Sequence, residues 1–182
     1  NYYEKGLLIS EVTKDDDGNL FLEKENVYQL KDIHTGSTLP DEIKMDPAGA
    51  AFPALTETRE KFYEGEASAG KSTSMSYAYD AKGNVIDYTD FGDDGDDDNL
   101  NAIISYHNLA DKYLIGVPKS IVVSGLGTTY RKRESEMDPA TGDVTLLETD
   151  LFFIELGSGG SGDLLAVNGN VNLNNAILDG DL

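Results

Sequence analysis

The stretch Gly65-Glu66-Ala67-Ser68-Ala69-Gly70-Lys71-Ser72 has the spacing G-x-x-x-x-G-K-[ST] of phosphate-binding loops. In those loops, backbone N–H groups and a helix N-terminus hold the phosphates, so a buried strand precedes the loop and a helix follows it. Here residues 56–63 are strongly charged, residues 73–79 alternate as a strand does, and Glu66 would put a carboxylate into the anion site. The sequence therefore predicts a polar hairpin loop, with nucleotide binding as the alternative.

Carboxylates gather in two short runs, Asp93-Asp94-Gly95-Asp96-Asp97-Asp98-Asn99 and Asp15-Asp16-Asp17-Gly18-Asn19. Oxygen ligands of this kind suit Ca²⁺, but neither run has EF-hand spacing or a closing Glu. We expect solvated loops at both runs. A Ca²⁺ site, above all at Asp93–Asp98, is the alternative.

The sequence has two histidines, His34 and His107, and no cysteine. It therefore excludes thiolate metal sites, disulfides and a cysteine nucleophile, and it disfavours a multi-histidine metal site. Neither histidine has a Ser or Cys nucleophile beside it in the sequence, so packed or surface histidines are expected, with a triad assembled in space as the alternative. Gly125-Leu126-Gly127 lacks the third glycine of a dinucleotide site. No catalytic, cofactor-binding or metal-ligating residue is predicted, and no cofactor.

The composition limits the partners. With 34 acidic and 14 basic residues the formal charge is −20, which repels nucleic acid and anionic membranes. No apolar run approaches the roughly 18 residues of a membrane span. The ten tyrosines are expected to pack across strands, with a carbohydrate-binding platform as the alternative.

The elements that must position these residues follow a period of two, as in Met75-Ser76-Tyr77-Ala78-Tyr79. This alternation is typical of half-buried strands. Turn residues separate the alternating segments at 17–19, 82–84, 126–127 and 141–143. Together they predict an antiparallel all-β fold. Residues 39–53 are interpreted as an irregular crossover, and residues 56–63 fit either a short helix or a charged strand.

An internal repeat relates Tyr3–Val12 to Tyr113–Val122. A hairpin turn follows each copy, at Gly18 and Gly127, and a second turn follows at Thr35-Gly36 and Thr141-Gly142. A single hairpin cannot bury its own apolar face, so repetition predicts hairpins stacked into one curved sheet.

The segment Tyr79-Asp80-Ala81-Lys82-Gly83-Asn84-Val85 resembles the YD-repeat signature of RHS proteins, with Asp17–Leu20 and Asp138–Val144 as weaker copies. Tyr113–Pro118 and the acidic stretch before it are similar to segments between YD repeats in Tc-toxin B components and SpvB-like proteins. The resemblance covers about residues 1–156. It implies a spiralling β-hairpin shell that encloses a toxic domain in bacterial toxins, and a secreted or cell-surface bacterial location. Asp138-Pro139-Ala140-Thr141-Gly142 is superficially similar to the RHS self-cleavage region, but a turn is the favoured interpretation.

Three segments are predicted: a YD-repeat-like β domain at 1–156, a Gly/Ser linker at 157–162 and a strand-like tail at 163–182. The pure Gly/Ser composition is typical of an engineered tether, with a natural linker as the alternative. The tail contains no Lys, Arg or aromatic residue. We expect it to add a strand to an open sheet edge, on its own chain or on a second copy by swapping, with a disordered tail as the alternative.

Three classes of function remain. The first is a structural, non-catalytic segment of an RHS/YD-repeat protein that scaffolds or encapsulates and contacts other segments of the parent shell. The second is a cell-surface adhesion or binding module that pairs a β-strand or peptide at its sheet edge, with or without Ca²⁺. The third is a hydrolase with dispersed acidic residues. The repeat favours the first, and neither nucleic acid nor membrane insertion is expected.

Overall fold

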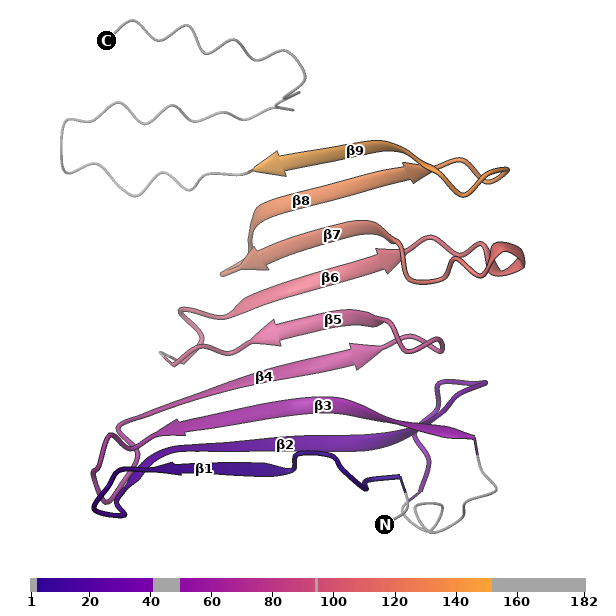
Figure 1. Cartoon of the computed structure of the whole chain (residues 1–182). Helices are drawn as coiled ribbons and strands as arrows, with labels where there is room; N and C mark the ends of the chain where they lie inside the picture. Colours follow the sequence, from indigo (N-terminus) through magenta and orange to yellow (C-terminus); the bar gives the residue numbers. More distant parts are fainter. Residues whose placement is uncertain (1–2, 41–49, 94, 152–182) are drawn as a thin grey trace, which may run out of the picture. The chain divides into compact units, whose positions relative to one another are not determined.

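The computed structural model describes residues 3–40, 50–93 and 95–151, which form antiparallel β-strands with no α-helix among them (Figure 1). Within each part of the chain, strands that follow one another in the sequence are neighbours in the sheet. The all-β prediction is therefore confirmed. The chain divides into two compact units, Asn1–Ala102 and Ile103–Leu182, which are described separately below.

The first unit is a meander of five strands in which each strand pairs antiparallel with the next. The strands are β1 (Ser10–Lys14), β2 (Leu20–Asp32), β3 (Ala51–Phe62), β4 (Lys71–Tyr79) and β5 (Val85–Asp90). Strand β6 (Leu100–Tyr106) spans the boundary between the units.

In the second unit a 3₁₀ turn, η2 (Ala110–Lys112), precedes β7 (Pro118–Gly125), β8 (Thr128–Met137) and β9 (Val144–Leu151). Strand β8 pairs antiparallel with β7 on one side and with β9 on the other. The β7–β8 connection consists of Leu126 and Gly127, both with positive φ (49° and 73°), as a tight right-twisted hairpin requires.

The alternation in β2 sets its inner face. Asn26 and Leu30 are buried while the neighbouring Glu25 and Gln29 are exposed. The pairing of β2 with β3 contains a bulge. Val27 lies opposite Glu57 and Tyr28 lies opposite Leu55, so Thr56 is the extra residue on β3.

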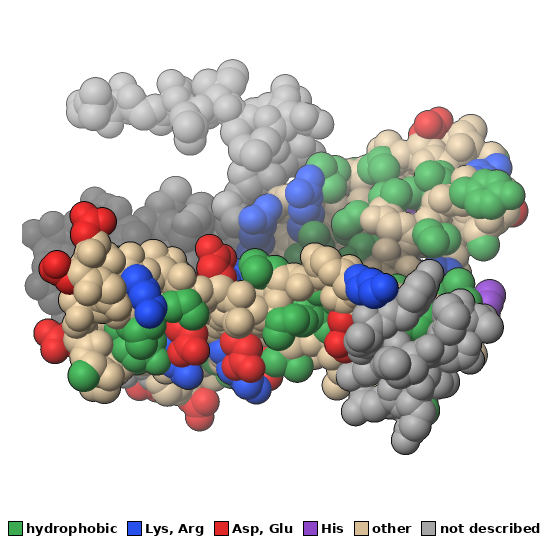
Figure 2. Space-filling model, turned by 60° about the horizontal axis from the view of Figure 1, so that its bottom comes forward, with side chains coloured by type: hydrophobic (Ala, Val, Ile, Leu, Met, Phe, Trp, Pro, Cys, Tyr) green, Lys and Arg blue, Asp and Glu red, His purple; other side chains and the backbone are tan. Residues whose placement is uncertain are grey.

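The core is small. Among the described residues, Leu30 and Ala54 are the buried hydrophobic side chains, and each is 1% exposed. Many larger apolar side chains remain exposed, and the face drawn in Figure 2 has hydrophobic groups between charged ones. These exposed side chains are Leu8, Ile9, Val12, Phe21, Ile33, Phe91, Leu100, Ile103, Tyr113, Ile115, Leu126, Val144, Leu146 and Leu147.

The crossover predicted at residues 39–53 is wrong at its C-terminal end. Strand β3 already begins at Ala51, and Pro53 lies opposite Leu30 of β2. Proline is tolerated there because β3 pairs with β4 only from Glu57 onward, so no ladder bond on that side needs the missing N–H. Residues 56–62 are strand, which decides between the two interpretations of that segment.

Candidate functional site

The phosphate-loop match lies in a hairpin loop. Residues 63–70 join β3 to β4, which are antiparallel neighbours, and the Gly70 N–H donates to the Phe62 carbonyl at 2.9 Å. Lys71 opens β4, and its Nζ lies 2.7 Å from Asp93 Oδ2; this hydrogen bond raises the pKa of the lysine. The predicted polar hairpin loop is confirmed, and the strand–loop–helix context of a nucleotide site is not formed by these residues.

A shallow polar depression of about 400 Å³ lies over β3, β4 and the loop after β5. The two cations that line it, Arg59 and Lys61, are paired with carboxylates, and so is Lys71, which precedes the lining residue Ser72. Arg59 Nε lies 2.6 Å from Glu57 Oε1, Lys61 Nζ lies 3.3 Å from Glu23 Oε2, and Lys71 pairs with Asp93. Because these charges are already neutralised, the depression offers little to an anionic ligand.

The acidic run after β5 is held by hydrogen bonds within the loop. Asp98 Oδ2 accepts from the Asp93 N–H at 2.8 Å, and Asp96 Oδ1 accepts from Asn99 Nδ2 at 3.1 Å. Asp93 and Asp96–Asp98 are exposed, and Asp94 lies outside the described residues. No group of three or more metal-ligating side chains occurs within the described part of the chain.

His107 follows β6 directly and contacts a serine that sequence reasoning missed. Its Nε2 lies 3.0 Å from the Ser135 carbonyl oxygen and 3.1 Å from Ser135 Oγ. A carbonyl only accepts, so Nε2 carries the proton. The Ser135 hydroxyl in turn donates to the Pro118 carbonyl at 2.5 Å. The imidazole nitrogen that faces this serine is therefore a donor, not a base, and the contact ties the end of β6 to β7 and β8.

His34 lies in an exposed loop, where its backbone N–H donates to Asp32 Oδ1 at 2.8 Å. The two histidines belong to different units, His34 to residues 1–102 and His107 to residues 103–182.

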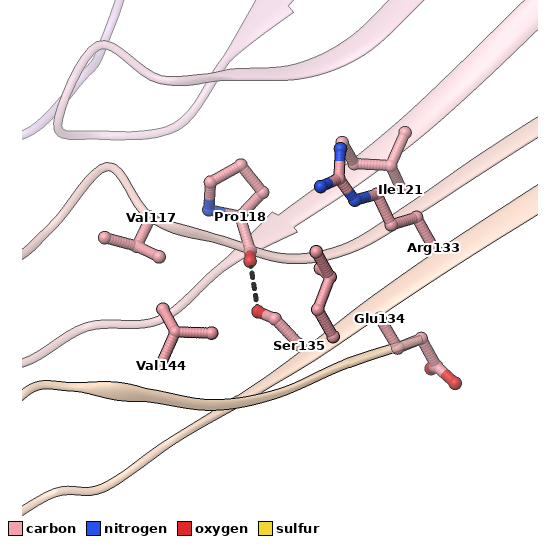
Figure 3. A pocket seen from close by; sticks show the side chains of 8 residues that line it. Val117, Pro118, Ile121, Arg133, Glu134, Ser135 and Val144 are labelled. Carbon is pink, nitrogen blue, oxygen red and sulfur yellow. Dashed lines mark hydrogen bonds between the residues drawn. The ribbon is translucent and has the colours of Figure 1, made fainter. Parts of the chain in front are cut away.

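A pocket of about 270 Å³ lies beside Ser135, between the start of β7 and the start of β9 (Figure 3). Its apolar walls are Val117, Pro118, Ile121, Val144 and Leu147, and Arg133 and Glu134 also line it. The Ser135 hydroxyl faces the Pro118 carbonyl at its edge, as the dashed line in Figure 3 shows. The pocket is thus a mainly apolar hollow, and the Ser135 hydroxyl at its edge is already hydrogen-bonded.

The residues that recur are aspartates that open the hairpin loops. Asp15 Oδ1 accepts from the N–H groups of Asp17 (3.0 Å) and Asn19 (2.8 Å), and its Oδ2 accepts from Asn19 Nδ2 at 2.9 Å. In the loop after β4, Asp80 Oδ1 accepts from Lys82 and Asn84 at 2.8 and 2.9 Å, and its Oδ2 accepts from Asn84 Nδ2 at 2.9 Å. The two loops therefore share one hydrogen-bond pattern with the sequence D-x-x-G-N.

A second loop type, D-x-x-T-G-x, occurs after β2 and between β8 and β9. In both loops the aspartate N–H donates to the carbonyl of the last loop residue, from Asp32 to Ser37 and from Asp138 to Asp143, each at 2.9 Å. The threonine hydroxyl accepts from the N–H two residues on, at 3.3 Å in the first loop and 3.2 Å in the second. Asp138–Asp143 is thus a turn, as predicted.

These hydrogen bonds lower the pKa of three loop aspartates. For Asp15 the largest cause is the Asn19 side chain, and for Asp32 it is the backbone N–H of Thr35. Partial burial raises the pKa of Asp80, but the hydrogen bonds from Asn84 and Lys82 outweigh it, so the net shift is also downward. The sequence signal that would have identified these residues is an Asp three residues before the turn glycine, as at Asp15 and Asp80, or four residues before it, as at Asp32.

Tyrosines pack across strands at two places. The rings of Tyr77 and Tyr88, which lie directly opposite each other on β4 and β5, are 5.4 Å apart. Tyr79, which precedes Asp80, packs edge-on against Phe52 at 6.4 Å and donates its hydroxyl to the Leu55 carbonyl at 2.7 Å. In the Tyr79-Asp80 pair, the tyrosine therefore fixes the end of β4 to β3, and the aspartate closes the following loop by hydrogen bonds.

Comparison of the chain with protein-family models, with curated proteins and with solved structures gives no match. None of the helices within the described residues has the length and hydropathy of a membrane span. The predicted linker at 157–162 and tail at 163–182 lie outside the described residues.

Proposed function

We propose that this chain is a structural, non-catalytic segment of an RHS/YD-repeat-like protein, which forms part of a sheet wall in a secreted or cell-surface bacterial toxin. The observation that carries the proposal is the shortage of core. Two described hydrophobic side chains are buried, whereas fourteen large ones are exposed. A sheet with so little apolar burial needs further protein to cover it.

The repeated loops support the same role. Two loop types, each used twice and each opened by Asp, reverse the chain with the same local chemistry. A repeat unit of this kind suits an extended wall, in which each hairpin is covered by its neighbours.

The contacts of His107 support a non-catalytic role. The hydrogen bonds of its Nε2 and of the Ser135 hydroxyl are used within the fold, so the Ser–His contact lacks the proton acceptor that nucleophilic catalysis needs.

The test compares this chain alone with a longer chain that includes the neighbouring segments of its parent gene. Alone, it should bind an apolar-surface dye and melt at a lower temperature; in the longer chain, dye binding should fall and the same strands should melt higher, because the exposed apolar groups become covered. Equal dye binding and equal melting in both chains would contradict the proposal.

A binding module is the second candidate, and the β1 edge favours it. All five residues of β1 are exposed, and among the described strands it pairs only with β2. Hydrogen exchange in the longer chain separates the two roles. If the parent protein protects the β1 amides, the edge is part of a wall; if they exchange freely, the edge is open to a partner strand.

A further inference from the structure

Strand β9 offers a free edge. One side pairs with β8 from Arg131 opposite Leu151 to Met137 opposite Val144. β9 is last in the strand order, and no strand of the described residues pairs with its other side. That side presents a row of backbone donors and acceptors to an added strand.

An apolar pocket adjoins the same strand. Val144 and Leu147 of β9 are 52% and 55% exposed, and both line the hollow with Val117, Pro118 and Ile121 (Figure 3). A free edge provides main-chain hydrogen bonds, and a neighbouring pocket accepts alternate side chains. Together they form the recognition geometry of strand addition.

The chain itself continues from this strand. After Leu151 come 31 residues, including the Gly/Ser run 157–162 and the segment 163–182. A reversal within the Gly/Ser run would bring residues 167–178 back along β9, because six residues are ample for a hairpin loop. The tether also makes pairing intramolecular, with an effective concentration of order millimolar.

The composition of the segment suits this place. Val171 and Leu173 alternate with Asn170, Asn172 and Asn174, so an extended backbone puts the apolar side chains on one face. Between Val167 and Leu178 there is no proline and no charged side chain, the two features that usually block an edge.

We propose that residues 167–178 pair antiparallel with the free edge of β9 on the same chain and place Val171 and Leu173 over the pocket formed by Val144 and Leu147. This inference does not rest on the proposed structural role, because it concerns one edge and one segment of this chain.

Hydrogen exchange of the full chain tests the proposal. Amides from Val167 to Leu178 should exchange at least about tenfold more slowly than the same amides in an isolated peptide of residues 163–182. Leu147→Lys should remove this protection because it puts a charge into the pocket. Leu126→Lys is the matched control, since Leu126 is 65% exposed and lies outside the pocket, and it should leave the protection unchanged.

Two further measurements keep the test decisive. Val171 lies outside the described strands, so Val171→Asp should abolish the protection while the melting of β1–β9 persists. This variant keeps the test valid even if Leu147→Lys fails to fold. Light scattering gives the oligomeric state, which should be monomeric. Free-peptide exchange rates in the full chain would overturn the proposal. A protected segment found only in a dimer would replace it with swapping between two copies.

Discussion

Asn26 joins three parts of the first unit through its buried side chain. It is 8% exposed, its Nδ2 donates to the Leu8 carbonyl at 2.9 Å, and its Oδ1 accepts from the Thr58 hydroxyl at 3.1 Å. Its backbone N–H also donates to the Ile9 carbonyl at 2.8 Å. A buried amide whose donors and acceptors are both used fixes the segment before β1 against β2 and β3.

Asn26→Ala should lower the free energy of unfolding by about 1–3 kcal/mol, because it leaves the Thr58 hydroxyl without its acceptor and leaves the Leu8 carbonyl with only the long 3.5 Å hydrogen bond from the Tyr28 hydroxyl. Urea denaturation measures the change. Ser68→Ala, at an exposed loop position, is the control and should shift stability by less than about 0.5 kcal/mol. Equal effects of the two substitutions would show that the Asn26 contacts contribute nothing.

Leu126 lies in the opposite situation, since its backbone is unfavourable and its side chain is 65% exposed. Its φ of 49° lies in the left-handed region, which costs a branched side chain about 1–2 kcal/mol. Leu126→Asn should therefore stabilise the β7–β8 hairpin by roughly 0.5–1 kcal/mol, because Asn tolerates this conformation and suits a two-residue turn. A thermal melt measures the gain, and an unchanged or lower melting temperature would contradict it.

Some of these structural features could be predicted from the sequence and others could not. The turn at Leu126-Gly127 could be predicted because its signal is local. The role of Asn26 could not, because its partner Thr58 is 32 residues away and nothing near Asn26 indicates which strand will lie opposite. The His107–Ser135 contact was missed for the same reason, since 28 residues separate the pair.

At the scale of the elements, the loops pack against one another as well as closing hairpins. A Cβ built on Gly36 would lie 2.5 Å from the Cα of Ala81, so the loop after β2 lies against the loop after β4. Gly18 has a similar φ, 85° against 71°, but nothing lies within 4 Å of its Cβ position. Gly18 is therefore needed only for its backbone conformation, whereas Gly36 is needed for its backbone conformation and also because a side chain would collide with Ala81.

Gly18→Ala should cost about 1–2 kcal/mol through its positive φ alone. Gly36→Ala should cost the same plus a further 1–3 kcal/mol, because the new methyl group meets backbone that must move. Chemical denaturation of both variants measures the difference. Equal losses would mean that the two loops do not constrain each other.

Strands such as β4 could be predicted because the alternation along the strand and the glycine in the turn that follows it are both local signals. The start of β3 was not, because Pro53 normally indicates a strand end. It is strand here because β3 extends beyond β4, and that offset is a property of the pairing rather than of residues 51–56.

At the scale of the whole molecule, two electrostatic effects oppose each other as the pH falls. The formal charge is −20 at pH 7, so the carboxylates repel one another, and protonating them relieves this repulsion. Asp15, Asp32 and Asp80, in contrast, have a pKa below the ordinary 3.8 because their loops donate hydrogen bonds to the charged form; for Asp80 these outweigh partial burial. A lowered pKa contributes stability that is fully present above the unfolded pKa and is lost as the pH falls through the folded pKa. The loops should therefore lose this contribution below about pH 4.

Asp80→Asn isolates that contribution, because it keeps the shape of the side chain and removes its titration. The variant should be less stable than the parent at pH 7, where Asp80 is charged and accepts three hydrogen bonds from Lys82 and Asn84. The gap should narrow between about pH 4 and pH 2, as the parent carboxylate becomes protonated. Urea midpoints across this range measure the gap, and subtracting the two curves removes the general relief of repulsion that both proteins share. Asp97→Asn, in the exposed acidic run, removes the same charge without these loop contacts and should leave a much smaller gap at pH 7. A gap for Asp80→Asn that stays constant from pH 7 to pH 2 would show that the charge of this carboxylate does not hold the loop.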